Sequence, residues 1–400
     1  MSNVSSSNGL EKYPKLRFKG FSEQWVTMKL SDFTKRIMRK NAKNETNIPL
    51  TISSKDGLIN QNDFFNKQVA SKDMSGYYLL HRGEYAYNKS YSVGYDFGSI
   101  KRLEKYNMGA LSTLYICFAL TQFDSDFIKH YFDSLKWYKE IYMISAEGAR
   151  NHGLLNVPTD DFFATLHTLP SNLAEQRKIA TFLDALTRRI EKQRSLVENL
   201  KKYKRGLLQH IMRQNNDWEK VRLSDILFER KTYCEKDGTY EHATLSKEGV
   251  YGKTDRYDRD YLVMDDEKKY KITKLGDLCY NPANLKFGVI CLNTYGDAIF
   301  SPIYITFEIA PNYNKDFIGL LLTRADFIKR ALRYQQGTVY ERMAVSPEDL
   351  LTMEISVPTL ETQNRIAHLF TNLDARIKKN EFVLEGLQNG KKQLLSSLFV

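Results

Sequence analysis

Two short segments of this 400-residue chain contain parts of known catalytic motifs, but neither motif is complete. Tyr251-Gly252-Lys253-Thr254 has the Gly-Lys-Thr of a phosphate-binding P-loop, yet Lys247 stands where that loop needs its first glycine. Tyr280-Asn281-Pro282-Ala283 lacks the second proline and the aromatic residue of an amino-methyltransferase motif. The sequence therefore predicts neither a nucleotide-binding loop nor an adenine-methylating site.

Residues that commonly bind metals or act as nucleophiles are scattered along the chain. The seven histidines include no i, i+4 pair and no H-E-x-x-H motif, and the four cysteines include no C-x-x-C pair. A G-x-S-x-G nucleophile and a clear cluster of nuclease carboxylates are also missing from the sequence. We therefore expect no metal or cofactor bound by this chain. The missing motifs do not exclude an unfamiliar enzyme, but the duplicated domains described below are easier to explain as a binding device than as one active site.

The composition favours a polyanionic partner. The 59 Lys+Arg exceed the 48 Asp+Glu by a formal net charge of +11, and 25 Tyr and 22 Phe are interleaved with Lys, Arg and Asn. Such mixtures can bind phosphates and read bases, although most of the aromatic side chains are expected in the cores. No apolar run is long enough for a membrane span and the start lacks a secretory signal, so we expect a cytoplasmic protein.

The elements that would position binding residues occur twice. Four motifs return at offsets that fall from 193 to 189, and the helices after them return at 187, which indicates a duplication of one mixed α/β (α+β) domain. Strands are predicted at 114–120 and 303–309, and helices at 126–139 and 316–333. The repeated motifs are Trp25-x4-Leu30-Ser31-Asp32 with Trp218-x4-Leu223-Ser224-Asp225, Ser54-Lys55-Asp56-Gly57 with Ser246-Lys247-Glu248-Gly249, Gly83-Glu84-x-x-Tyr87-Asn88 with Gly276-Asp277-x-x-Tyr280-Asn281, and Ser112-x-x-Tyr115-Ile116-x-Phe118 with Ser301-x-x-Tyr304-Ile305-x-Phe307.

Each copy ends in a long helix with an apolar heptad seam, and the two seams match position by position at an offset of 187. Both seams have polar residues at the same two places, which is expected to restrict the register. The first seam is Ile179, Leu183, Leu186, Ile190, Gln193, Val197, Leu200, Lys204, Leu207 and Ile211. The second seam is Ile366, Phe370, Leu373, Ile377, Asn380, Leu384, Leu387, Lys391, Leu394 and Leu398.

A heptad helix of this length needs a partner to cover its apolar seam. Because the chain contains two matched copies, we expect an intramolecular antiparallel coiled coil about 50 Å long. The alternative is that each helix pairs with another chain in a homodimer. The expected organisation is a flexible lead-in at 1–17, a first domain at 18–170, a central helix at 171–212, a second domain at 213–357 and a C-terminal helix at 358–400.

The combination resembles the specificity subunit of type I restriction-modification enzymes over nearly the whole chain, from about Phe18 to Val400. The most specific element is Pro170-x4-Glu175-Gln176-x-x-Ile179-Ala180, which returns as Pro358-x4-Gln363-x-x-Ile366-Ala367 before the second helix. The second copy has Thr362 in place of the glutamate and one residue fewer after the proline, so a role for Glu175 common to both copies is not implied.

The resemblance implies two target recognition domains, each of which reads one half of a bipartite, asymmetric sequence of double-stranded DNA. The helices would set the unread gap and bind the partner subunits. The family's subunit is not catalytic: two methyltransferase (M) subunits bring S-adenosylmethionine, and restriction/translocase (R) subunits bring ATP- and Mg-dependent cleavage. No contact with a membrane is implied.

Candidate DNA-binding residues are the polar and cationic side chains of predicted loops, because Arg and Lys can bind guanine or phosphate and Asn can bind adenine. In the first domain they are Arg36, Arg39, Lys40, Lys43, Lys55, Lys89, Tyr91, Lys101, Arg102, Arg150 and Asn151. In the second domain they are Arg230, Lys231, Lys247, Arg256, Arg259, Asn284, Lys286, Tyr340 and Arg342. The loops that contain Arg150 and Asn151, and Tyr340 and Arg342, are favoured because they occupy matched places before the closing strand.

Two other functions remain as alternatives to DNA recognition. A coiled-coil scaffold whose domains bind proteins or glycans would show no steep loss of DNA affinity with salt. A free-standing nuclease or methylase would turn over substrate without partners.

Overall fold

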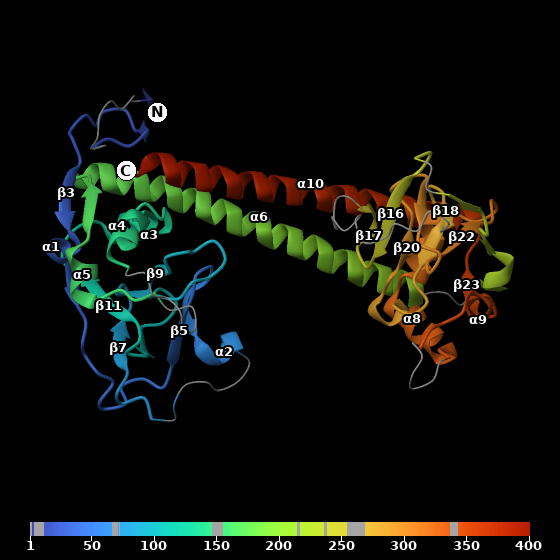
Figure 1. Cartoon of the computed structure of the whole chain (residues 1–400), viewed down its shortest axis with the longest axis horizontal. Helices are drawn as coiled ribbons and strands as arrows, with labels where there is room; N and C mark the ends of the chain where they lie inside the picture. The colour runs from blue at the N-terminus through green and yellow to red at the C-terminus, as the bar shows by residue number, and fades with distance from the viewer. Residues whose placement is uncertain are drawn as a thin grey trace. The chain divides into compact units, whose positions relative to one another are not determined.

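The computed structural model describes residues 2–3, 12–65, 71, 73–145, 155–213, 217–235, 238–253, 269–336 and 343–400. The chain forms two compact units, the first made of Met1–Leu196 with Glu381–Val400 and the second of Val197–Asn380. Each unit contains one sheet-rich domain and parts of two long helices, α6 (Leu173–Arg213) and α10 (Leu360–Leu398) (Figure 1). The predicted fold class, two mixed α/β domains with two long helices, is confirmed.

The first domain has two four-stranded sheets with the orders β6-β5-β10-β7 and β4-β11-β8-β9, and a ribbon β12-β3. Only β5 and β10 run parallel among the strand pairs described in this domain. The strands are β3 (Val26–Lys29), β4 (Thr34–Arg36), β5 (Pro49–Ser53), β6 (Gly57–Asn60), β7 (Tyr78–His81), β8 (Tyr85–Asn88), β9 (Ser99–Arg102), β10 (Met108–Leu111), β11 (Ile116–Leu120) and β12 (Leu166–Leu169). In the lead-in, β1 (Ser2–Asn3) pairs with β2 (Leu16–Arg17).

The second domain repeats this topology with the orders β14-β22-β19-β20, β15-β18-β21-β16-β17 and β13-β23. Here β16 and β21 form the parallel pair. The strands are β13 (Glu219–Arg222), β14 (Leu227–Glu229), β15 (Tyr233–Cys234), β16 (Glu241–Ser246), β17 (Gly249–Gly252), β18 (Tyr270–Thr273), β19 (Leu278–Tyr280), β20 (Ile290–Leu292), β21 (Ala298–Phe300), β22 (Ile305–Ile309) and β23 (Glu354–Val357).

Short helices cover the sheets at matched places. Asp124 caps α3, and Asn314 caps its counterpart α7, each through a side-chain oxygen that accepts backbone N–H bonds in the first turn. The first domain contains α1 (Leu30–Phe33), α2 (Gln61–Phe65), α3 (Ser125–Asp133), α4 (Tyr138–Ile144) and α5 (Thr159–Ala164). The second contains η1 (Leu223–Asp225), η4 (Leu285–Phe287), α7 (Lys315–Leu322), α8 (Ala325–Ala331), η5 (Leu332–Tyr334) and α9 (Pro347–Leu351).

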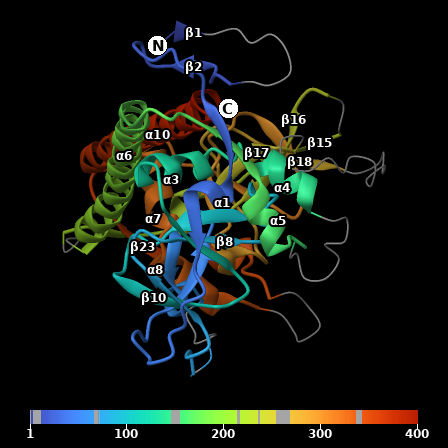
Figure 2. The same cartoon turned by 90° about the vertical axis from the view of Figure 1, so that its left-hand side faces the viewer.

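The two long helices pair antiparallel in each unit. In the first unit, Leu183 near the start of α6 shares a core with Leu398 at the end of α10. In the second unit, Met212 near the end of α6 shares a core with Phe370 near the start of α10. Figure 2 shows the two helices side by side, with α3 of the first domain beside them. All twenty seam positions are buried or half-buried.

Among the described residues, no helix combines the length and the apolar character that crossing a membrane requires.

Candidate nucleic-acid interface

Two of the repeated motifs of the first domain meet at one edge of a sheet. Because β5 and β10 run parallel, the chain leaves both strands at the same edge. The turn after β5 contains Lys55, and the turn after β10 spans 112–115. Tyr115 Oη lies 3.4 Å from Thr51 Oγ1 of β5, which holds the second turn against that strand.

The loop between β8 and β9 joins the same edge. Ser54 Oγ lies 2.9 Å from Ser92 Oγ and 3.1 Å from Ser99 Oγ. Of the candidate residues here, Lys55 and Tyr91 are exposed and Lys89 is half-buried. We call the three segments 53–57, 89–98 and 112–115 the loop edge of the first domain.

The second domain has an equivalent loop edge, formed by 246–249, 281–288 and 301–304. The parallel strands β16 and β21 both end here, and Tyr304 Oη lies 3.4 Å from Thr244 Oγ1, as Tyr115 does from Thr51. Residues 247–249 and 286–288 line one cavity, so the first two segments are neighbours. The loop edge contains three candidates, of which Lys247 and Lys286 are exposed and Asn284 is half-buried.

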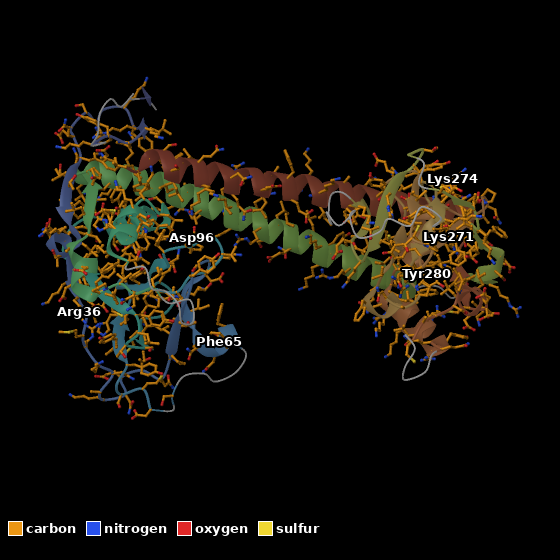
Figure 3. All side chains as sticks on the ribbon, in the orientation of Figure 1. Arg36, Phe65, Asp96, Lys271, Lys274 and Tyr280 are labelled. Carbon is orange, nitrogen blue, oxygen red and sulfur yellow. The ribbon has the colours of Figure 1, made fainter. Side chains whose placement is uncertain are left out.

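The two loop edges share a frame but differ in content. We call the second segment of each loop edge, between β8 and β9 or between β19 and β20, the middle loop. Asn88 and Asn281 stand at equivalent places at its start, and Gly98 (φ 77°) and Gly288 (φ 80°) end it in the left-handed conformation that favours glycine. Between these positions the first loop has nine residues, 89–97, and the second has six, 282–287. Figure 3 shows Asp96 of the longer loop on the side of its domain away from Arg36. The frame is repeated while the surface that it presents is not.

Lys101 and Arg102, at the end of β9, are held in ion pairs. Lys101 Nζ lies 2.7 Å from Asp133, and Arg102 lies 2.6 Å from Asp126 and 2.7 Å from Glu104. Burial opposes the charge of Lys101, but Asp133, Tyr95 and Glu104 together outweigh burial and raise the pKa of the lysine. Both cations are therefore paired within the domain.

Arg39 and Arg230 bind the acidic residue of a repeated motif. Arg39 donates to Glu84 at 2.8 and 3.0 Å, and Arg230 donates to Asp277 at 2.8 and 3.0 Å. The hydrogen bond that Arg230 donates to Asp277 raises the pKa of Arg230 above its usual value. These contacts fasten the segment that follows β4 or β14 to the turn before β8 or β19.

Lys40 forms a cation–π pair that has a counterpart in the second domain. In the second domain the aromatic residue stands at the position of Lys40 and the lysine at the position of Tyr78. Lys40 Nζ lies 4.1 Å from the centre of the Tyr78 ring, and at the equivalent strand positions Lys271 Nζ lies 5.7 Å from the centre of the Tyr233 ring. The ring and the cation have thus changed places while their attraction is retained. Lys231 is exposed and lies 3.4 Å from Glu229.

The remaining candidates fall into two groups. Arg36 on β4 and Lys43 are exposed. The candidates Arg150, Asn151, Arg256, Arg259, Tyr340 and Arg342 lie outside the described residues, so both of the favoured matched loops do too.

The sequence patterns did not single out the tips of the 112–115 and 301–304 turns. Leu114 is 66% exposed and Ile303 is 61% exposed, and both are large aliphatic residues at the same place in the repeat. The one signal in the sequence was that both residues lie inside the repeated Ser-x-x-Tyr motif. An apolar residue repeated in this way is usually a core residue, so the repeat did not suggest an exposed side chain.

The Gln of the repeated Pro-Gln-Ile element joins each domain to its helix. Gln176 Nε2 donates to Pro170 O at 2.8 Å and Gln176 Oε1 accepts from Asp124 N at 2.8 Å. Glu175 has a different role: it accepts two hydrogen bonds from Arg17, at 2.7 and 2.8 Å, in a pair that is nearly inaccessible to solvent. This pair anchors the lead-in of the first unit.

The seam lysines make equivalent contacts in the two units. Lys204 Nζ lies 2.5 Å from Asp374 Oδ1, and Lys391 Nζ donates to Thr187 Oγ1 at 2.8 Å. Lys391 and Lys204 are 187 positions apart, and so are Asp374 and Thr187. The register of the helix pair is therefore the same in both units.

The surroundings of these lysines differ. In the first unit, His130 Nε2 lies 2.8 Å from Asp184, and burial lowers the pKa of His130 and of Lys391. In the second unit, Leu320 stands at the position equivalent to His130 and Thr371 at the position equivalent to Asp184. They border a cavity of about 830 Å³ between α7, α8 and the long helices. The place that the His130–Asp184 contact occupies in the first unit is thus part of the wall of a cavity in the second unit.

Among the described residues, no group of three or more His, Cys, Asp or Glu side chains could hold a metal ion.

Comparisons with known proteins show what part of the sequence and what fold this chain shares with them. Residues 215–385 match the family Methylase_S, described as Type I restriction modification DNA specificity domain. The S subunit of a Type-I restriction-modification system from M. genitalium shares the fold with a TM-score of 0.57 at 14% identity, over 97% of this chain and 99% of that chain. A structure from work on complex assembly and conformational transition of the type I R-M system has a TM-score of 0.55 at 16% identity, over 94% of this chain and 97% of that chain. No curated protein matches the chain.

Proposed function

We propose that this chain, whose resemblance to type I restriction-modification specificity subunits is confirmed by its DNA specificity domain and its fold, reads a bipartite DNA sequence. The observation that carries the proposal is the pair of loop edges. Each is a repeated frame with cations, and each holds a middle loop of different length and sequence. Two readers of unlike content suit the two unlike halves of an asymmetric target.

The long helices set the gap between the half-sites in this proposal. A seam of about 33 residues at 1.5 Å per residue is about 50 Å long, which suits half-sites one to two helical turns apart on DNA. The equivalent contacts of Lys204 and Lys391 support a single register, because a helix pair that slipped would lose them.

We further propose that two methyltransferase subunits bind this chain and bring S-adenosylmethionine, and that restriction/translocase subunits bring ATP and Mg. The chain itself would supply no catalytic group. DNA sequence and partner subunits would therefore meet on a protein that contributes recognition and spacing only.

The test is a genome-wide map of methylated adenine in cells that produce this chain with its methyltransferase partner. We expect one two-part motif with a fixed gap, and none in matched cells that produce the methyltransferase alone. Methylation without a gapped motif, or an unchanged map when the chain is omitted, would contradict the proposal.

Salt dependence separates this function from a scaffold that binds proteins or glycans. The affinity of the assembled chain for duplex DNA should fall steeply as salt rises, because each phosphate that a cation neutralises releases condensed counterions. Substituting Lys55 or Lys247 with alanine should reduce the slope of log K against log salt by about one. A complex without affinity for duplex DNA would favour the scaffold.

A further inference from the structure

The turn tips that carry Leu114 and Ile303 have a feature that a shared fold alone does not require. A repeated apolar residue is usually buried, since burial is what keeps it apolar through divergence. These two side chains are instead 66% and 61% exposed. Their retention at equivalent places therefore needs a contact outside the domain that both copies make.

The structure fixes both tips in the same way. The backbone N–H of Tyr115 donates to Ser112 O, and that of Tyr304 donates to Ser301 O, each at the close of its turn. The hydroxyls of the same tyrosines lie 3.4 Å from Thr51 and Thr244. Each tip is thus presented on a turn that is held at two points.

The neighbours of the tips identify the partner. Each tip lies at a sheet edge with a repeated exposed lysine, Lys55 or Lys247, and with a middle loop that differs between the copies. A surface that meets the shared tip would also meet the differing loop. Duplex DNA has this character, because its backbone and groove shape are common to all sequences while its base edges vary. The cations beside each tip also complement a polyanion.

We propose that Leu114 and Ile303 insert into a groove of duplex DNA at equivalent places in the two half-sites. They make apolar, sequence-independent contacts that set the depth and register at which the middle loops meet the bases. This inference rests on the proposed function and adds a division of labour to it: the shared tips position, and the unlike loops discriminate.

The experiment uses the full chain assembled with its methyltransferase partner, and a mixed-sequence 60-base-pair duplex as the probe. Leu114→Ser and Ile303→Ser should each weaken binding about tenfold, because transferring about two thirds of an aliphatic side chain out of water contributes on that scale. The slope of log K against log salt should stay unchanged, since no charge is removed. The same loss is expected on a duplex that contains the methylated motif, so the preference for that motif should not change.

The matched control is Leu275→Ser. Leu275 is 62% exposed in the same domain as Ile303, on the turn between β18 and β19 at the other end of β21. It should leave DNA affinity at the wild-type value. Thermal unfolding midpoints should be alike for all three single variants, because each side chain is mostly exposed.

Three results would overturn the inference. Wild-type affinity of both tip variants for the mixed-sequence duplex would show that the tips do not touch DNA. Unchanged DNA affinity with weaker methyltransferase assembly would assign the tips to a protein contact. A loss confined to the motif duplex would make them discriminating residues. A wild-type complex that binds no duplex DNA would remove the proposed function itself, which is a separate outcome.

Discussion

Gln363 makes in the second unit the same two hydrogen bonds that Gln176 makes in the first. Its Nε2 donates to Pro358 O at 2.8 Å, and its Oε1 accepts from Asn314 N at 3.0 Å. Asn314 caps α7 as Asp124 caps α3. One side-chain amide in each unit therefore connects the closing strand, the long helix and the cap of the first covering helix.

Removing either amide should loosen the attachment of a domain to its helix. Gln176→Ala and Gln363→Ala each leave two backbone groups, which are buried or half-buried, without this partner, at a cost of about 1 to 3 kcal/mol in the free energy of unfolding. Urea unfolding of the full chain measures this cost. Gln209→Ala, on an exposed part of α6, is the control and should change stability by less than about 0.5 kcal/mol. A cost for Gln176→Ala no larger than that of the control would show that these bonds do not hold the junction.

Breaking the buried pair of Arg17 and Glu175 should be more costly. The two side chains are 4% and 1% exposed, and Glu175→Gln would leave the Arg17 guanidinium buried without its counter-charge. We expect a loss of about 3 to 5 kcal/mol, measured by urea unfolding. Replacing both residues, Arg17→Met with Glu175→Gln, should restore part of it because no unpaired charge remains. If the double variant lost a further 3 to 5 kcal/mol or so (about the same again) relative to Glu175→Gln, the cost would not come from an unpaired buried charge, and the prediction would be wrong.

His167 should make the first unit sensitive to mild acid. Its two ring nitrogens lie 2.8 Å from Tyr131 Oη and 2.9 Å from Thr165 Oγ1, and burial lowers the pKa of His167 to about 3. The unfolded chain takes up this proton near pH 6.5, so it binds more protons than the folded chain between about pH 6.5 and 3. Stability is therefore lost as pH falls below 6.5, by about 2 kcal/mol at pH 5 from this group.

Urea unfolding at pH 7.5, 6 and 5 tests this linkage. The free energy of unfolding of His167→Asn should fall less than that of the wild type as the pH is lowered. The difference in slope should correspond to about one fewer proton taken up on unfolding, whatever the stability of the variant at pH 7.5. Burial also lowers the pKa of His130, so part of the acid sensitivity should remain. His210→Asn, at an exposed position of α6, is the control. An identical pH dependence in wild type and His167→Asn would contradict the prediction.

Lengthening the helix pair tests its role as the spacer. A heptad inserted after Val197, with a matching heptad after Glu381 in α10, keeps both seams in phase and lengthens the pair by about 10.5 Å. Since this equals about three base-pair steps of DNA, we expect methylation at the original gapped motif to stop, and any new motif to have a longer gap. The methylated-adenine map measures both. Methylation that continues at the original gap would show that the helices do not set it.

The sequence alone determined the duplication, the fold class and the helix seam, because these follow from local pattern. Apolar residues at heptad spacing lie on one side of a helix and are buried when that side packs against another helix. Motifs that recur in the same order indicate that the same topology is repeated. The Pro-Gln-Ile element also pointed to the resemblance to type I specificity subunits, but the sequence did not show what the glutamine does. That the glutamine bonds to a helix cap about 50 residues away in the chain became visible only in the structure.

Only the tertiary structure separated the candidate cations by their surroundings. Arg39, Lys101 and Arg102 look like Lys55 in the sequence, yet the first three are paired with acidic side chains that come from distant segments. Exposure and pairing depend on contacts across the fold, which local pattern does not encode. For the same reason the sequence predicted Leu114 and Ile303 as the first residues of strands, whereas the strands begin at Ile116 and Ile305 and the two side chains are exposed on the turns before them.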